Sequence, residues 1–163
     1  MTLNNEAMLK TIAFSLQEAS IRNNLLLFSN PYLTRFNMLS PPKISIADYL
    51  ISLYNKSKES RSCFLSAFIL LDRLLLKQPH IIITPFNVHK LCLCSILIAS
   101  KFLSDRGLTN NDWAVIGGVP VSELNLLELE FLFLIEFSLV ISKDEYNKYE
   151  EVFIVKSKLP IFN

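Results

Sequence analysis

Glycine is scarce in this sequence: only three occur among 163 residues, and two of them, Gly117 and Gly118, are adjacent. The alternation of apolar and polar residues that marks a β-strand is nowhere sustained, so the pattern favours helices joined by short connections. A chain of this length is long enough for one domain with its own core and too short for two comfortable ones. The sequence therefore predicts a single all-α domain.

Charge is also in short supply. The net charge is +1, with no basic block and no acidic tail, which argues against a nucleic-acid partner. Charged residues make up 19% of the chain and apolar residues 51%, so part of the apolar excess has to lie outside a monomer's core. A partner interface is one candidate for that excess.

The long apolar stretches are all interrupted. Residues 81–100 contain Pro85 and Lys90, and residues 124–142 contain three glutamates, so both are expected to be buried helices rather than membrane spans. The first ten residues lack the basic start and unbroken apolar run of a secretory signal. We therefore expect an intracellular protein, in the cytoplasm, the nucleus or both, with no membrane partner.

Cysteine and histidine are few, and their positions do not fit a catalytic or metal-binding site. The three cysteines, Cys63, Cys92 and Cys94, lie in strongly apolar stretches, which suits buried reduced thiols. Cys92 and Cys94 are two positions apart on an expected helix and point to nearly opposite sides, so they are badly placed to share a metal ion. His80 and His89 lie in no recognisable nucleophile or metal-binding motif. We expect no catalytic residue, no metal, no cofactor and no small-molecule ligand.

Capping residues mark the starts of the expected helices. Ser45, with Asp48 three residues later, and Ser60, before a long apolar run, can each satisfy free backbone donors at a helix start. Thr84 followed by Pro85 is a favourable cap and first-turn pair. The expected helices lie at about residues 4–27, from 45, from 60 to a stop at Pro79, from 84 to 103, from Ser122, and at about 144–156, with an irregular connection around Pro31, Pro41 and Pro42.

Four charged residues interrupt the apolar helices: Asp72, Lys101, Glu128 and Glu130. Because an unpaired buried charge is costly, each needs an internal partner or a place at a surface that another molecule covers. Asp72 fits a structural role as a buried acid, and Glu130, like Glu136, fits an ordinary solvated face. For Lys101 and Glu128, charge alone favours an internal ion pair, although helices lying side by side could bring both to one rim of the bundle.

Two long stretches, TPFNVHKLCLCSILIASKFLSD and NNDWAVIGGVPVSELNLLELEFLFLIEFSLVIS, resemble the cyclin box, specifically that of the phosphate-regulon-like group called P-type or U-type cyclins. The earlier stretches PPKISIADYLISLY and SCFLSAFILLDRLL fit the first two box helices of that group in order and spacing. The resemblance covers about residues 40–145. It implies a single five-helix cyclin box at residues 40–142, after an N-terminal helix and connection at 1–39 and before a short C-terminal helical extension at 143–163.

The resemblance implies a regulatory subunit that binds and activates a cyclin-dependent protein kinase and has no enzymatic activity of its own. In cyclins, the Lys that ends the third box helix and a Glu in the fifth hydrogen-bond backbone groups beside the kinase's regulatory helix, and Lys101 and Glu128 occupy the matching positions. Apolar contact around this pair would by analogy come from four residues, namely Phe102, Leu132, Phe137 and Leu139. The alternative is a cyclin-fold adaptor or scaffold protein that does not activate a kinase.

Two further family features match less closely. The buried acid of the second box helix usually pairs with an arginine, for which Lys43 is the nearest replacement here. Mitotic cyclins hold substrate peptides in an apolar groove that includes a tryptophan, and the nearest matches are Ile46 and Tyr49, without the tryptophan. We therefore do not carry the groove over to this chain.

Overall fold

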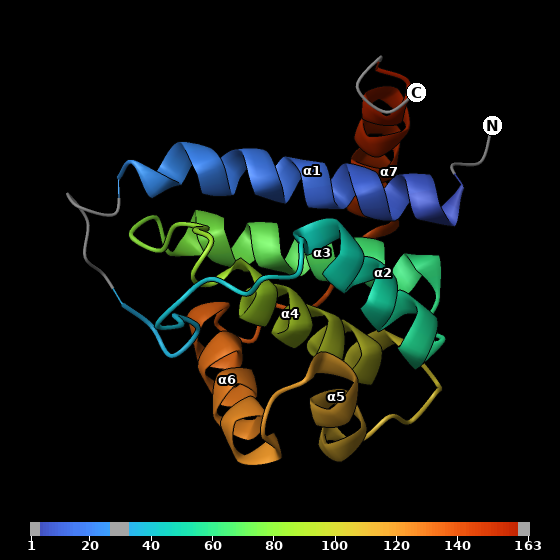
Figure 1. Ribbon diagram of the computed structural model, residues 1–163. Coiled ribbons are helices and arrows are strands. Elements are labelled where there is room, and N and C mark those ends of the chain that lie inside the picture. Colours follow the sequence, from blue (N-terminus) through green and yellow to red (C-terminus); the bar gives the residue numbers. More distant parts are fainter. Residues whose placement is uncertain (1–3, 27–32, 160–163) are drawn as a thin grey trace.

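Seven α-helices and no strands are present in the part of the chain that the computed structural model describes, residues 4–26 and 33–159. The helices are α1 (Asn5–Asn24), α2 (Ile46–Ser57), α3 (Arg61–Lys77), α4 (Val88–Leu103), α5 (Asn110–Gly117), α6 (Val121–Leu134) and α7 (Lys143–Ser157). Figure 1 shows α1 across one side of the bundle and α5 and α6 on the opposite side. The all-α prediction is confirmed, and α2 to α6 lie within residues 40–142, the range expected for the five-helix box. The short α5 was not among the helices expected from the apolar pattern.

Side-chain caps set several of the helix starts. The hydroxyl groups of Ser45 and Ser60 each accept a hydrogen bond from the backbone amide three residues later, at 3.0 and 3.1 Å, which confirms both expected starts. Ser142 caps α7 in the same way, and that helix lies close to its expected range. At the other end of the chain α1 ends at Asn24; residue 27 of its expected range and Pro31 lie outside the described residues.

The expected start of α4 is wrong by one turn. Thr84 and Pro85 form a separate turn, in which Oδ1 of Asn87 accepts from the backbone amide of Thr84 at 2.9 Å, and the helix begins at Val88. The cause is local: an asparagine side chain offers the backbone a hydrogen bond that competes with the helical one.

The expected start of α6 is also displaced. The helix begins at Val121 after Pro120, so Ser122 lies inside the first turn instead of capping it. Proline has a fixed φ and lacks an N–H group, and both properties suit it to the entrance of a helix.

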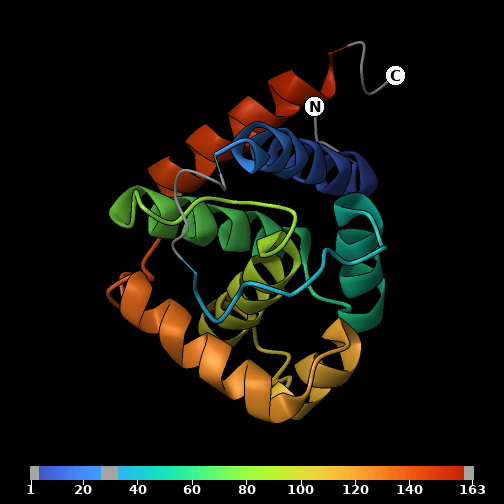
Figure 2. The ribbon, with the colours of Figure 1, turned by 60° about the vertical axis from the view of Figure 1, so that its left-hand side comes forward.

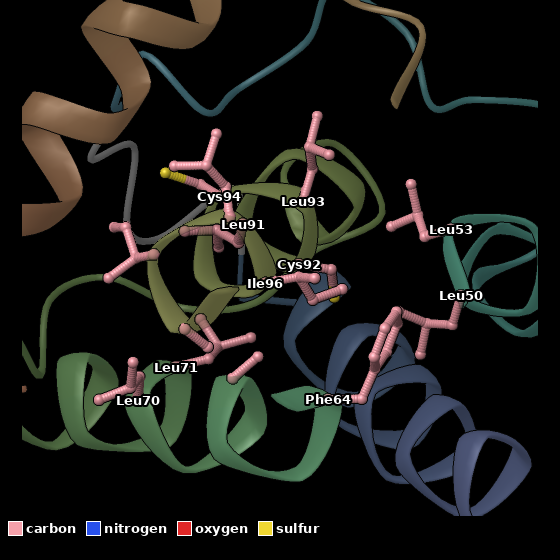
Figure 3. Close-up of a cluster of buried hydrophobic side chains, with 14 of the residues drawn as sticks. Leu50, Leu53, Phe64, Leu70, Leu71, Leu91, Cys92, Leu93, Cys94 and Ile96 are labelled. Atoms are coloured by element: carbon pink, nitrogen blue, oxygen red, sulfur yellow. The ribbon is translucent and has the colours of Figure 1, made fainter. Parts of the chain in front are cut away.

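The most deeply buried helix is α4. Twelve of its 16 residues are buried, because α3 packs along it and α2, α5 and α6 contact its other sides. Figure 3 shows Leu71 of α3 and Leu50 and Leu53 of α2 around the α4 residues Cys92 and Ile96. Only the last three residues of α4, 101–103, are exposed, so this helix leaves the core at its C-terminal end.

Both flanking helices share the core of the box. Helix α1 contributes Leu9, Ile12 and Leu16, and α7 contributes Phe153, whose ring centroid lies 4.9 Å from that of Phe68 in an edge-to-face contact. Figure 2 shows α1 and α7 side by side along α3, in agreement with the contacts between these helices. Burial of these apolar side chains stabilises the box from outside its five helices.

Asp72 is half-buried, and its partner differs from the expected one. Its carboxylate accepts a hydrogen bond from the hydroxyl of Tyr149 on α7. Lys43 is exposed and does not make the expected pairing, so that expectation is corrected. A tyrosine hydroxyl supplies the donor without burying a second charge, which is the less costly way to satisfy the acid.

The three cysteines are free and buried, as expected. Burial raises the pKa of Cys92 to about 12, and burial with the nearby charge of Glu59 raises that of Cys63 to about 12, so both remain thiols. Among the described residues, no group of three or more His, Cys, Asp or Glu side chains is placed to hold a metal ion. In the same ranges, every helix is too short or too polar to cross a bilayer.

Candidate functional site

Lys101 and Glu128 form an ion pair at the surface. Lys101 lies in the last turn of α4, where that helix leaves the core, and Glu128 lies in the middle of α6. Nζ of Lys101 is 2.7 Å from Oε1 of Glu128, and the two side chains are 41% and 17% exposed. A cation in the last turn also suits the negative end of the helix dipole. The ion pair expected from charge alone is confirmed, and it lies at an accessible rim.

A second contact fixes the other carboxylate oxygen of Glu128. Nδ2 of Asn110, the first residue of α5, donates to Oε2 of Glu128 at 2.6 Å and to Oδ1 of Asn125 at 2.6 Å. The network thus joins α4, α5 and α6. Neither asparagine was singled out from the sequence, and the signal that could have found Asn125 is its position three residues before Glu128, on the same face of α6.

The pair keeps hydrogen-bonding capacity for a partner. The ammonium group of Lys101 has three donors and uses one of them on Glu128. Each carboxylate oxygen of Glu128 accepts one hydrogen bond within the protein and keeps a lone pair. The two side chains can therefore donate to a carbonyl and accept from an amide without breaking their own contact, which is the pattern that a peptide backbone requires.

The four apolar residues expected around the pair lie at two depths. Phe102 and Phe137 are 50% and 55% exposed, whereas Leu132 and Leu139 are half-buried and pack against the core. The ring of Phe137 lies edge-on to that of Phe133, with centroids 5.3 Å apart, and Phe102 makes no ring contact within the described part of the chain. The structure therefore brings two of the four expected apolar residues to the surface and keeps two partly beneath it.

The chain turns sharply after α6. Glu136 and Phe137 both have left-handed backbones, with φ of 56° and 54°, a conformation that costs a non-glycine residue about 1 kcal/mol or more. The Phe137 amide donates to the carbonyl of Leu132 at 2.9 Å, and Arg73 donates to the carbonyl of Ser138 at 2.6 Å. These bonds hold the turn that brings Phe137 to the surface. Glu136 is 63% exposed, the solvated position expected for it.

Glu130 does not lie on the solvated face that was expected. Its side chain is only 24% exposed, and its Oε2 is 3.5 Å from Nε of Arg35 in the segment before α2. The helical pattern of α6 could not reveal this, because the neighbouring segment comes from far away in the sequence. Both side chains line a hollow of about 640 Å³ between α6 and residues 33–35, which is also lined by the exposed side chains of Leu129 and Phe133.

The positions that match the substrate groove of mitotic cyclins have internal contacts here. Ile46 is 6% exposed, and the hydroxyl of Tyr49 donates to the carbonyl of Gly117 at 2.9 Å. Burial raises the pKa of Tyr49, so this hydroxyl stays protonated and keeps its role as a donor. Both side chains thus contribute to packing between α2 and its neighbours.

Comparisons with known proteins identify the family. A family model described as Cyclin matches residues 5–139. Cyclin-U4-3 of Arabidopsis thaliana is 38% identical over 144 residues, which cover 88% of this chain and 65% of that protein. Cyclin-U4-2 of the same plant is 40% identical over 117 residues, and Cyclin-P4-1 of Oryza sativa subsp. japonica is 39% identical over 114, with 72% and 70% of this chain and 54% of each relative covered.

The matched region spans between about half and two thirds of the length of these relatives. It includes all five helices of the box and both residues of the ion pair. The resemblance to P-type and U-type cyclins is confirmed. The chain belongs to the cyclin family.

Proposed function

We propose that this chain binds a cyclin-dependent protein kinase and activates it by positioning the kinase's regulatory helix. The observation that carries the proposal is the Lys101–Glu128 ion pair, which lies at an accessible rim and has hydrogen-bonding capacity to spare. Membership of the cyclin family supports it, because a lysine and a glutamate at matching positions contact the kinase backbone in that family.

The mechanism is a shift in population. An active kinase needs a glutamate on its regulatory helix paired with the lysine of the ATP site. A partner that binds only the conformation with the helix inward makes that conformation the dominant one. Lys101 would donate to a backbone carbonyl, and Glu128 would accept from a backbone amide, beside that helix. The kinase then reaches its active arrangement without any chemistry by the cyclin.

The charged pair and the apolar side chains would contribute differently to such a complex. The charged pair fixes the register of the kinase segment, because misplaced partners leave a charge desolvated and unpaired. The exposed rings of Phe102 and Phe137 supply apolar area, which contributes most of the affinity. Leu132 and Leu139 would support this surface from below.

The proposal extends to the organisation of the chain. Residues 40–142 would form the kinase-binding box, residues 1–39 an N-terminal support and residues 143–163 a C-terminal one. The kinase partner implies that the protein acts inside the cell, in the cytoplasm, the nucleus or both.

Exchange of the two charges tests the proposal most sharply. The double variant Lys101→Glu with Glu128→Lys keeps an ion pair within the protein but reverses donors and acceptors toward the kinase. We expect it to remain folded and to lose kinase binding, with a lower melting temperature because the exchange opposes the α4 dipole and removes the acceptor of the Asn110 hydrogen bond. Lys101→Ala and Glu128→Ala should each weaken binding at least about 30-fold while lowering stability by about 1 kcal/mol. Binding is measured by calorimetry against a panel of purified cyclin-dependent kinases, and activation by their phosphorylation rates.

Glu6→Ala is the matched control, because it breaks the exposed ion pair between Glu6 and Lys10 on α1, away from the site. Restoration of kinase binding by the charge exchange would contradict the proposal and leave the pair with a structural role only. A kinase that binds the wild-type chain without a rise in its rate would instead support the adaptor or scaffold function.

A further inference from the structure

We infer that Asn110 is a positioning residue, which holds the carboxylate of Glu128 in the orientation that the kinase contact requires. This inference rests on the proposed function, because it concerns the same ion pair. Its starting point is that both donors of one side-chain amide are directed at α6: one hydrogen bond goes to Glu128 and the other to Asn125, each at 2.6 Å.

Chemistry fixes which way the Asn110 amide points. Its two neighbours on α6 are the carboxylate of Glu128 and the side-chain oxygen of Asn125, and both are acceptors. A reversed amide would bring its oxygen within hydrogen-bonding distance of the Glu128 carboxylate, which has no proton to donate. The carboxylate therefore locks the amide with one N–H directed at Glu128, and Asn125 accepts the other.

The lock leaves one polar atom unsatisfied. Oδ1 of Asn110 is buried and has no hydrogen-bond partner in the described part of the chain. A buried acceptor of this kind is destabilising, and natural proteins tolerate few of them. Because an apolar residue at this position would avoid the cost, the asparagine indicates a role beyond the stability of α5.

That task follows from the geometry of Glu128. Lys101 holds one carboxylate oxygen at 2.7 Å and Asn110 holds the other, so the carboxyl group is fixed at both ends before any partner arrives. Without Asn110 the carboxylate can turn about its terminal bond, and a partner has to immobilise it on binding. Immobilising a side chain reduces affinity, so preorganisation of Glu128 strengthens the contact.

A double-mutant cycle tests whether Asn110 acts through Glu128. We expect Asn110→Ala to weaken binding of the kinase that the wild-type chain binds best by about tenfold, the effect of one hydrogen bond to a charged group. In the Glu128→Ala background the same substitution should have almost no further effect. Equal losses in both backgrounds would overturn the inference, and so would unchanged affinity in the single variant. Asn111→Ala, at the exposed neighbouring position on α5, is the control and should bind like wild type.

Asn110→Asp separates positioning from helix stability. An acidic residue in the first turn favours the helix. If Asn110 only helps to start α5, Asn110→Asp should therefore bind the kinase as well as Asn110→Ala or better. If Asn110 positions Glu128, Asn110→Asp should bind the kinase more weakly than Asn110→Ala, because the new carboxylate repels Glu128 and displaces it. Kinase binding weaker than that of Asn110→Ala supports the inference, and stronger binding contradicts it.

An NMR experiment on the isolated chain keeps this inference distinct from the proposed function. The side-chain amide protons of Asn110 should exchange with solvent much more slowly than those of Asn111, and Glu128→Ala should remove most of the difference. Exchange of the Asn110 protons as fast as those of Asn111 would refute the preorganisation of Glu128 even if kinase binding is found. Slow exchange with no kinase binding would leave the positioning contact intact and defeat the proposed function alone.

Discussion

At the scale of single residues, His89 is buried in the first turn of α4 with only one ring nitrogen in use. Its Nε2 donates to the carbonyl of Ile44 at 2.8 Å, while its Nδ1 is buried and has no partner among the described residues. The ring is 8% exposed and lies 5.2 Å from the ring of Tyr49. Burial lowers the pKa of His89 and outweighs the opposing effect of the Ile44 hydrogen bond. The folded protein therefore holds this imidazole in its neutral form.

This predicts a loss of stability in mild acid. In the unfolded chain the histidine takes up a proton near its ordinary pKa of about 6.5, whereas the folded protein resists protonation. The unfolded state thus binds more protons as the pH falls below that value, and the free energy of unfolding should decrease between about pH 7 and pH 5. Urea denaturation across this range measures the effect. His89→Gln, which keeps a donor for Ile44, should flatten the pH dependence relative to His80→Gln; parallel curves for the two variants would contradict this.

Charged residues were only partly predictable at this scale. The Lys101–Glu128 ion pair follows from charge within apolar helices, because an unpaired charge there is costly. The Asp72–Tyr149 hydrogen bond does not, since its two ends are 77 positions apart and depend on how α7 crosses α3. Asn110 was hidden for another reason: an asparagine after a helix cap is common, and only the fold brings it beside Glu128.

At the scale of helices, the junction of α5 with α4 depends on the absence of one methyl group. A Cβ atom on Gly117 would lie 2.5 Å from both terminal methyl carbons of Leu93, which is fully buried. The carbonyl of Gly117 also accepts the hydrogen bond from Tyr49. The close approach of α5 thus links α4 and α2 through a single position.

Gly117→Ala should destabilise the fold by about 1–3 kcal/mol, because overpacking forces Leu93 out of its place. Gly118→Ala is the comparison, since its Cβ would meet nothing within 4 Å and only its φ of 70° is unfavourable. Chemical denaturation should rank Gly117→Ala as the more damaging variant. Leu93→Ala, made in the Gly117→Ala background, should cost less than it does alone. The reverse ranking, or strict additivity, would show that this contact is not tight.

Every helix except the short α5 was expected from the sequence pattern, and helix starts were predictable in part. Where a serine hydroxyl caps the first turn, as at Ser45 and Ser60, the sequence locates the start. At α4 an asparagine three residues after the expected cap forms a competing turn, and at α6 a proline precedes the helix. Where two nearby residues could each begin the helix, the sequence pattern therefore does not determine which one does.

At the scale of the whole molecule, α7 is attached to the box by both charge and apolar contact. Arg73 of α3 holds both carboxylate oxygens of Glu145 at 2.9 Å, and Arg61 pairs with Glu150. Phe153 is 2% exposed against α3. None of these α7 residues belongs to the rim formed by Lys101 and Glu128.

Removal of residues 143–163 should therefore lower stability while sparing the candidate site. We expect the free energy of unfolding to fall by about 3 kcal/mol or more, similar to or greater than the loss in Phe153→Ala. Kinase affinity per folded molecule should change little. Urea denaturation and calorimetric binding measure the two quantities. Loss of binding in a truncated chain that remains folded would place part of the interface on the C-terminal extension.

The architecture as a whole was the most predictable level: the apolar pattern indicates six of the seven helices, and the fifth box helix, the short α5, follows only from the resemblance. The pairing of α1 with α7 across α3 was not predictable in this way. The sequence pattern of neither helix shows which helix it packs against. Their contact depends on the path of the chain between them.

The burial of α4 on nearly every side also determines which of the two proteins would change conformation in the proposed complex. Lys101 is at the end of a helix that cannot tilt without opening the core, so this chain presents a surface of fixed shape. In the proposed complex, the ordering entropy of association would then fall mainly on the regulatory helix of the kinase. Calorimetry should accordingly show an entropic penalty that varies from one kinase to another and hardly at all between stable variants of this chain.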